Sequence, residues 1–217
     1  MRRRVIDLSH TISPQMPVYP GTEPPSFEQG TTVAADGFAE KRITFYSHTG
    51  THVDVPAHIF EDGTTIDAMP VDAFVGSALV IDVRGLEEIS TAVLTAHSEG
   101  LAHVQHVILR TGWSEHWGTE RYFEGYPVLT EQAAQWLATT SLTGVGVDAI
   151  SVDRCDAGRL PIHRILLSHG KVIVENLTEL HQLPQSAFSL SILPWKLQGG
   201  DGSPVRAVAT VDEPEAN

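Results

Sequence analysis

Three short, nearly continuous apolar runs constrain the fold of this 217-residue chain more than any other feature. They lie at residues 77–83, 104–110 and 144–148. Runs of this length are typical of strands that are buried on both faces, as in sheets that helices cover. A fourth strand is predicted at residues 43–46, where β-branched and aromatic side chains follow one another. We therefore expect a sheet with a buried centre.

Helical segments are fewer than strands. Thr130 is a suitable N-cap for a helix whose apolar positions are 133, 134, 136 and 137. Residues 88–99 and 160–169 are the other candidates. Strands outnumber helices and alternate with them only in the second half, so we expect an α/β chain with one β-rich mixed α/β domain over residues 1–217. A doubly wound nucleotide-binding fold is not expected, because the sequence has neither of the usual glycine-rich phosphate loops.

Charge and composition argue against several classes of function. Apolar residues make up 41% of the chain, while Lys and Arg total 14 against 27 Asp and Glu, a formal charge of −13. Such a surface repels phosphate backbones and anionic lipid, so we expect no nucleic-acid partner and no membrane partner. The start, Arg2–Arg4, is not followed by the apolar core of a signal peptide. The single cysteine, Cys155, suits a reducing compartment, and we expect a cytoplasmic protein.

A proline-rich segment lies near the start of the chain. Residues 13–30 contain five prolines and two glycines, which predicts a long irregular surface segment. Loops of this length inside compact domains are more often functional than idle.

Three histidines and one aspartate are concentrated in one stretch: His48, His52, Asp54 and His58. All four positions are even, so in an extended chain the side chains project to the same side. A helix is disfavoured here, because the stretch contains a glycine, two threonines, two valines and a proline. Imidazole and carboxylate groups are the ligands that zinc, manganese or iron prefer as nitrogen and oxygen donors. The alternative is a half-buried strand whose histidines form structural hydrogen bonds.

Metal binding makes a geometric demand on this stretch. In a straight strand His48 and His52 would lie ~13 Å apart, at ~3.3 Å per residue. Two histidine nitrogens on one metal lie only a few ångströms from each other. The backbone must therefore bend between them, and Gly50 is the residue at which a tight bend costs least.

The same stretch resembles the His-x-Gly-Thr-His-x-Asp-x-Pro-x-His signature of the cyclase family of metal-dependent hydrolases. That family includes bacterial kynurenine formamidases (arylformamidases), isatin hydrolases and polyketide cyclases. The resemblance implies the family's swivelling β/β/α fold and extends over most of the chain. Its other segments are residues 7–10, 16–21, 147–153, 175–177 and 201–207, together with His163.

Carried over by position, the formamidase pattern implies a site for one or two divalent ions per chain. His48, His52, Asp54 and Glu175 would hold one ion, and Asp54, His163 and Glu175 would hold the other. The two carboxylates would then bridge the ions. Zinc is favoured, and manganese is the alternative.

The resemblance also implies roles for two residues outside the coordination shell. His58 matches the family's catalytic acid–base position. Tyr19 takes the place where the formamidases carry a substrate-contacting tryptophan, so its identity departs from the formamidase pattern.

We therefore expect a hydrolase of carbon–nitrogen bonds other than peptide bonds, acting on a small aromatic amide through metal-bound hydroxide. The leading candidate is an arylformamidase that converts N-formylkynurenine to kynurenine and formate in tryptophan catabolism. The alternatives are a cyclic-amide hydrolase of the isatin type or a cyclase and, outside enzymes, a zinc-binding or sensing module. We also expect a homodimer or higher homo-oligomer.

The remaining histidines are scattered along the sequence and are expected on the surface or behind the ligands; they are His97, His103, His106, His116, His169 and His181. His10 is a separate case, because the resemblance places its segment near the pocket. Trp113 and Trp117 either pack in the core or at an interface or line a substrate lid. Cys155 lacks an activating neighbour in the sequence and is expected to be inert.

Overall fold

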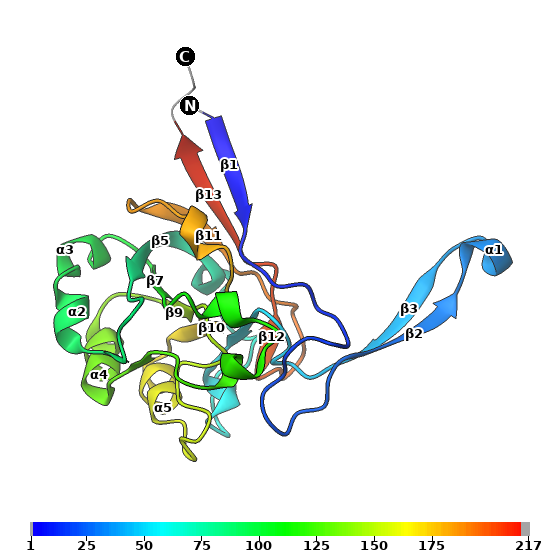
Figure 1. The fold of residues 1–217 in the computed structure, drawn as a ribbon, viewed down its shortest axis with the longest axis horizontal. Coiled ribbons are helices and arrows are strands. Elements are labelled where there is room, and N and C mark those ends of the chain that lie inside the picture. Colours follow the sequence, from blue (N-terminus) through cyan, green and yellow to red (C-terminus); the bar gives the residue numbers. More distant parts are fainter. Residues whose placement is uncertain (1, 214–217) are drawn as a thin grey trace.

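A nine-stranded sheet forms the centre of the computed structural model, which describes residues 2–213 (Figure 1). The strand order is β1-β13-β11-β5-β7-β9-β10-β4-β12. The four strands β5, β7, β9 and β10 run parallel, and antiparallel strands extend the sheet on both sides. The strands of this sheet are β1 (Arg2–Asp7), β4 (His52–Asp54), β5 (Val75–Asp82), β7 (His106–Arg110), β9 (Gly144–Val147), β10 (Val172–Glu175), β11 (Phe188–Ser191), β12 (Gly202–Pro204) and β13 (Val208–Glu213).

Two small two-stranded sheets and several helices complete the described part of the chain. β2 (Ser26–Thr31) pairs with β3 (Glu40–Thr44), and β6 (Glu88–Ile89) pairs with β8 (Val128–Leu129). The α-helices are α1 (Val33–Asp36), α2 (Thr91–Thr95), α3 (Ser98–Leu101), α4 (Glu131–Thr139) and α5 (Pro161–Ser168). The 3₁₀ helices are η1 (Pro56–His58), η2 (Val71–Phe74), η3 (Trp113–His116), η4 (Glu120–Phe123) and η5 (Leu180–Gln182).

The two faces of the sheet bury two hydrophobic clusters. Val107 and Leu109 of β7 belong to the cluster that includes buried residues of α2, α4 and α5, whereas Ile108 belongs to the other. That second cluster is enclosed by the curled sheet itself, through residues of β1, β4, β11 and β13. Adjacent residues of β7 therefore face opposite clusters, and both are apolar, which explains the continuous apolar run at 104–110.

The predicted β-rich mixed α/β fold is confirmed, as are the strands at 77–83, 104–110 and 144–148 and the helices at 130–137 and 160–169. Thr130 caps α4 as predicted, because its side chain accepts a hydrogen bond from the Ala133 amide. The helix expected at 88–99 is instead divided into β6, α2 and the start of α3. The strand expected at 43–46 begins earlier and ends at Thr44.

The expectation that His106 lies on the surface or behind the ligands is wrong. Its side chain points into the interior from β7 and is 1% exposed. Burial lowers the pKa of His106 to about 4, so the imidazole is neutral at physiological pH.

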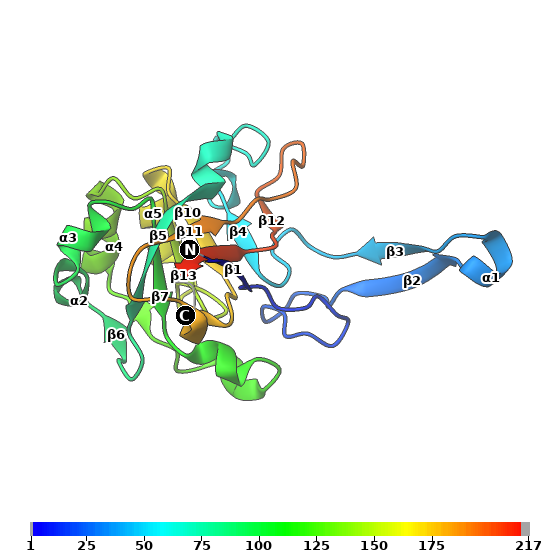
Figure 2. The ribbon, with the colours of Figure 1, turned by 90° about the horizontal axis from the view of Figure 1, so that it is seen from above.

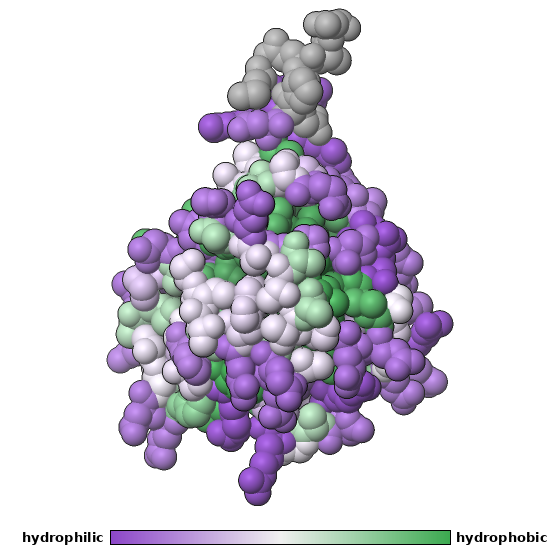
Figure 3. Space-filling view, turned by 90° about the vertical axis from the view of Figure 1, so that its left-hand side faces the viewer, coloured by the Kyte–Doolittle hydropathy of each residue, from purple (hydrophilic) through white to green (hydrophobic). Residues whose placement is uncertain are grey.

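An arm leaves the body of the molecule at residues 26–44 (Figures 1 and 2). It consists of β2, α1 and β3, and none of the residues in these elements is buried. On the face opposite the arm, hydrophilic residues surround several separate hydrophobic areas (Figure 3). None of the helices within residues 2–213 is long and apolar enough to cross a membrane.

Candidate metal centre

The bend demanded by the sequence lies at Gly50, whose φ is +65°. Two features disfavour any residue other than glycine at this position. The backbone is left-handed, and a Cβ would lie 3.1 Å from Cγ1 of Ile12. The bend places the rings of His48 and His52 at a centroid distance of 5.1 Å. The predicted curl between the two histidines is confirmed.

β4 presents the next two residues of the motif beside the end of a parallel strand. His52 lies opposite Glu175 of β10, and Asp54 lies opposite Ile173. Glu175 is the last residue of β10, at the edge where the carboxyl ends of the parallel strands meet. Ligand sites in parallel sheets form at this edge.

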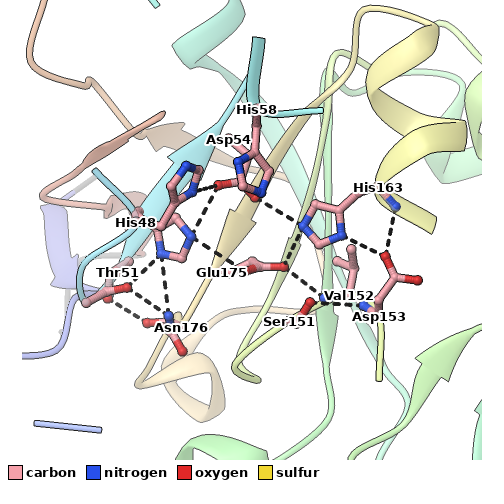
Figure 4. Close-up of polar contacts among 12 residues, drawn as sticks. His48, Thr51, Asp54, His58, Ser151, Val152, Asp153, His163, Glu175 and Asn176 are labelled. Carbon is pink, nitrogen blue, oxygen red and sulfur yellow. Dashed lines mark hydrogen bonds and ion pairs between the residues drawn. The ribbon is translucent and has the colours of Figure 1, made fainter. Parts of the chain in front are cut away.

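Three overlapping groups of ligand-type side chains result, and two of them share Asp54 (Figure 4). In the first, Nδ1 of His48 and Nε2 of His52 lie 2.6 Å and 3.2 Å from Oδ1 of Asp54. In the second, Nε2 of His163 lies 3.3 Å from Oε1 of Glu175 and 3.5 Å from Oδ2 of Asp54. Glu175 connects the groups, because its Oε2 lies 3.5 Å from Nε2 of His52. The structure thus brings together all five residues that the sequence assigned to metal binding.

Hydrogen bonds behind the rings fix the direction of two imidazoles. Nδ1 of His52 donates to the carbonyl oxygen of Gly50 at 2.9 Å. Nδ1 of His163 donates to Oδ2 of Asp153 at 2.7 Å. Both Nε2 atoms are therefore left facing the carboxylates, the arrangement in which a protein orients histidine ligands.

Asp153 and Asn176 hydrogen-bond to the centre, and the sequence argument gave neither residue a role of its own. Asp153 also accepts the amides of Ile162 and His163 at the start of α5. Asn176 has a φ of +58° and donates through its side chain to the Gly50 carbonyl at 2.8 Å. The signal for both residues was their place in family-like segments, 147–153 for Asp153 and 175–177 for Asn176.

The histidines and carboxylates of the centre change one another's pKa values. Burial by itself would raise the pKa of Asp54, but His52 and His48 hold it well below its ordinary range. Burial lowers the pKa of His163, and hydrogen bonds with Asp153, Asp54 and Glu175 outweigh this effect and raise it well above the ordinary value. Similarly, Asp54 and Asp201 overcome burial and raise the pKa of His48 to about 10. The protons on these rings occupy positions for which a metal cation competes.

One buried oxygen in the centre has no hydrogen-bond partner of good geometry among the described residues, although Nε2 of His163 lies 3.5 Å from it. It is Oδ2 of Asp54, a residue that is 0% exposed, in contrast to Oδ1, which His48 contacts. An unsatisfied buried carboxylate oxygen is costly. A divalent cation would satisfy it, and the nitrogen and oxygen donors around it suit such an ion.

His58 lies on η1, which begins at Pro56, and forms the third ligand-type group with His48 and Asp201. Its ring centroid is 4.0 Å from that of His48 and 5.7 Å from that of His163. The four even-numbered side chains of the motif are predicted to lie on one side of an extended chain. The extended segment ends after Asp54, because residues 56–58 form a 3₁₀ helix. This turn leaves the His58 side chain 24% exposed, at the wall of a cavity.

The cavity has a volume of about 510 Å³ and lies over the centre. Its floor includes His48, His52, His163 and Glu175. Its other walls come from residues 17–22 of the proline-rich segment, Tyr46 at the base of the arm, and the loop at residues 155–160. Tyr19 lines this cavity, and its hydroxyl donates to the carbonyl oxygen of Cys155 at 3.2 Å. Burial raises the pKa of the Cys155 thiol, in keeping with the expected inert role.

His10 and the two tryptophans form a support behind the site. His10 stacks on Trp117 with a centroid distance of 3.8 Å, and burial lowers its pKa to about 4. Trp117 packs against Tyr122, whose hydroxyl donates to Oδ1 of Asn176. Trp113 and Trp117 both pack against a buried cluster, so the core interpretation holds for these two side chains rather than the lid.

Comparison with known proteins agrees with this geometry. Residues 6–154 match the family described as "Putative cyclase". The chain is 36% identical to the kynurenine formamidase of Bacillus cereus over 205 residues, 94% of this chain and 95% of the relative. Isatin hydrolase A from Labrenzia aggregata, solved with benzyl benzoate, superposes with a TM-score of 0.87 at 27% identity, covering 97% and 94% of the two chains. A predicted metal-dependent hydrolase from Bacillus stearothermophilus gives 0.81 at 28% identity, covering 97% and 99%.

The match to the family covers well over half of the chain, and the formamidase relative aligns with nearly all of it. The chain belongs to the cyclase family of metal-dependent hydrolases.

Proposed function

We propose that this protein is an arylformamidase, a metal-dependent hydrolase that converts N-formylkynurenine to kynurenine and formate in tryptophan catabolism. The observation that carries the proposal is the pair of ligand-type groups that share Asp54 at the floor of a cavity, with His58 at its wall. A formamidase at 36% identity over nearly the full chain supports the choice of substrate.

The proposed ligands of one ion are His48, His52, Asp54 and Glu175, and those of the other are Asp54, His163 and Glu175. The unsatisfied Oδ2 of Asp54 and the outward-fixed Nε2 atoms support this assignment. Histidine-rich nitrogen and oxygen donor sets favour zinc over manganese. When bound, a divalent ion supplies a nucleophilic water at neutral pH and polarises the amide carbonyl.

The residues of the chain supply binding and proton transfer. Tyr19 offers an aromatic face to the ring of the substrate, because it lines the cavity opposite the centre's polar floor. His58 donates a proton to the aniline nitrogen as the C–N bond breaks, since its imidazole can act as an acid and a base and it reaches the cavity. The loop at residues 155–160 supplies a further wall of the cavity that would hold the substrate.

The decisive test is turnover by the purified protein with zinc or manganese. N-formylkynurenine, simple formanilides and isatin would be compared at equal concentrations. We expect the highest kcat/KM on N-formylkynurenine. Faster opening of isatin would favour the cyclic-amide alternative, which the superposition with isatin hydrolase A supports. No turnover of any of these amides with full metal content would favour a cyclase or a zinc-binding or sensing module.

Metal content is a separate prediction. We expect one or two divalent ions per chain after extensive dialysis, and loss of activity on chelation that zinc or manganese restores. Binding should weaken below neutral pH, because the imidazole ligands must lose their protons to bind. Elemental analysis tests this, and metal far below one equivalent, with no gain on adding zinc or manganese, would contradict the assignment.

Tyr19 offers a test of substrate contact. Tyr19→Phe and Tyr19→Trp should change KM or the preference among aryl amides and leave metal content unchanged, because Tyr19 lines the cavity but lies outside all three ligand-type groups. Steady-state kinetics on the three substrate types measures this. A gain in formamidase activity with Trp would indicate that the parent protein prefers another aromatic amide, and unchanged kinetics throughout would place Tyr19 outside the substrate's reach.

The proposed working form is a cytoplasmic homodimer or higher homo-oligomer built from one domain per chain. The arm supports this, since an isolated two-stranded hairpin is marginally stable in water. Its exposed apolar side chains include Val33, Phe38 and Ile43, which are 66%, 57% and 49% exposed. Contact with a second copy would cover them, as isologous contacts do in most oligomers.

We therefore expect light scattering to give at least twice the mass of one chain. The double variant Phe38→Ser with Ile43→Ser should shift the mass toward a single chain, whereas Leu86→Ser, an exposed site on the body, should not. A parent protein with the mass of one chain at micromolar concentration would refute the oligomer.

A further inference from the structure

The carboxylate of Asp201 faces the two histidines that differ most in their proposed roles. Its Oδ2 lies 3.0 Å from Nε2 of His48 and 3.8 Å from Nδ1 of His58. The first contact is a hydrogen bond, and the second is within ion-pair range but longer than a hydrogen bond. Asp201 also lines the cavity. No role has been assigned to it so far.

The fold holds Asp201 in this place from both sides. The next residue, Gly202, begins β12 and pairs with Asp54 of β4. A Cβ on Gly202 would lie 2.6 Å from Cε1 of His48, so only glycine lets the His48 ring pack against this strand. The backbone oxygen of Asp201 accepts the Val55 amide at 3.2 Å.

The loop before Asp201 is fixed as well. The Gly199 amide donates to Oδ1 of Asp67 at 3.0 Å, and the Ile66 amide donates to the oxygen of Gly200 at 2.8 Å. The position of the Asp201 carboxylate therefore follows from backbone pairing on the strand side and from a tied loop on the other side.

The two contacts use different nitrogens of the two rings. With Nε2 of His48 turned to Asp201, its Nδ1 faces Asp54 and the metal centre. With Nδ1 of His58 as the atom nearest Asp201, its Nε2 is the nitrogen left for the substrate. An anionic partner on one ring nitrogen fixes both the tautomer and the orientation of an imidazole.

We propose that Asp201 is a positioning residue that orients His48 for metal binding and His58 for proton transfer to the leaving nitrogen. The proposal rests on the proposed function, because it assigns Asp201 a part in the same reaction. It links the centre to the acid–base group through one carboxylate.

A double-mutant cycle tests the action through His58. Asp201→Ala should lower kcat on formanilides by ~10–100-fold, the usual cost of removing a partner behind a site histidine, with a small change in KM. The loss should shrink for electron-poor anilides, whose leaving amine needs little protonation. In a His58→Ala background, Asp201→Ala should cost at most a few-fold more, because the acid–base group is already absent and only the contact with His48 is left to lose. The kcat of Asp201→Asn should lie between those of the parent and Asp201→Ala, since an amide oxygen can still accept a hydrogen bond from one ring.

The control is Asp67→Asn, which alters the same loop through its contact with Gly199 and leaves the cavity untouched. It should keep parent kinetics. If Asp201→Ala lowers kcat by the same factor in both backgrounds, or if Asp67→Asn reproduces its defect, positioning of His58 is refuted. Loss of metal from Asp201→Asn, to the extent seen when a ligand is removed, would make Asp201 a ligand and also overturn the proposal.

A readout without turnover separates this proposal from the proposed function. Long-range ¹H–¹⁵N correlations of the zinc-loaded protein report which ring nitrogen of neutral His58 carries the proton. We expect protonated Nδ1 in the parent and in Asp67→Asn, and a mixture of tautomers in Asp201→Asn. A parent His58 protonated on Nε2 would refute the orientation, whether or not the protein hydrolyses aryl formamides.

Discussion

His58→Ala should retain its metal and lose about 10²–10⁴-fold in kcat on N-formylkynurenine, the usual contribution of a positioned acid or base. The reason is geometric. The His58 ring contacts the His48 ring and reaches the cavity, and the ligand-type group that contains it, with His48 and Asp201, shares neither Asp54 nor Glu175. Its removal should therefore leave the centre intact and deprive the leaving nitrogen of its proton donor.

The defect should depend on the leaving group. Electron-poor anilides leave with little protonation, so their kcat should fall least, while alkyl-substituted anilides should be affected most. Kinetics on a series of ring-substituted formanilides measures this, with elemental analysis on the same samples. His181→Ala is the matched control. The His181 side chain is 63% exposed, and the ion pair that it forms is with Glu179, away from the centre. Loss of metal from His58→Ala would make His58 a ligand, and full activity with full metal would mean that solvent supplies the proton.

The centre of the fold was predictable because its signals are local. β5 and β7 carry residues of both hydrophobic clusters, while the valines of β9 belong to one of them, and this burial leaves nearly continuous apolar runs in the sequence. The Thr130 cap is equally local, since donor and acceptor are three residues apart. The bend at Gly50 was predictable for a different reason, because two histidines of one strand cannot otherwise approach a common ion.

The residues that support the centre were not predictable in the same way. Asp201 is 153 residues from His48, and Asn176 is 126 residues from Gly50, so only the curled sheet brings these partners together. The arm had little signal, because its strands are short and exposed and show no apolar alternation; only the strand predicted at 43–46 overlaps it, at the end of β3. His106 was misjudged since one histidine in a buried strand looks the same in sequence as one at the surface.

Glu175→Gln should damage the centre more than its small change in size suggests. The Glu175 side chain is buried between the two groups, with Oε1 near Nε2 of His163 and Oε2 near Nε2 of His52. Its Oε1 also accepts the Val152 amide at 2.9 Å, a contact that glutamine can keep through its carbonyl oxygen. The substitution therefore preserves the fold around β10 and removes only the charge and one acceptor.

Both proposed ions lose a ligand in this variant, so we expect metal content to fall by at least about half and kcat to drop by more than the ~10–100-fold typical of residues behind the ligands. Added zinc should raise the melting temperature of the parent protein, because a ligand bound only by the folded state stabilises it, and this rise should be much smaller in Glu175→Gln. Glu99→Gln, at an exposed position of α3, is the control and should match the parent in all three measurements. Parent values of metal content, kcat and zinc-induced stabilisation in Glu175→Gln would exclude Glu175 from the ligands and reduce the site to the group formed by His48, His52 and Asp54.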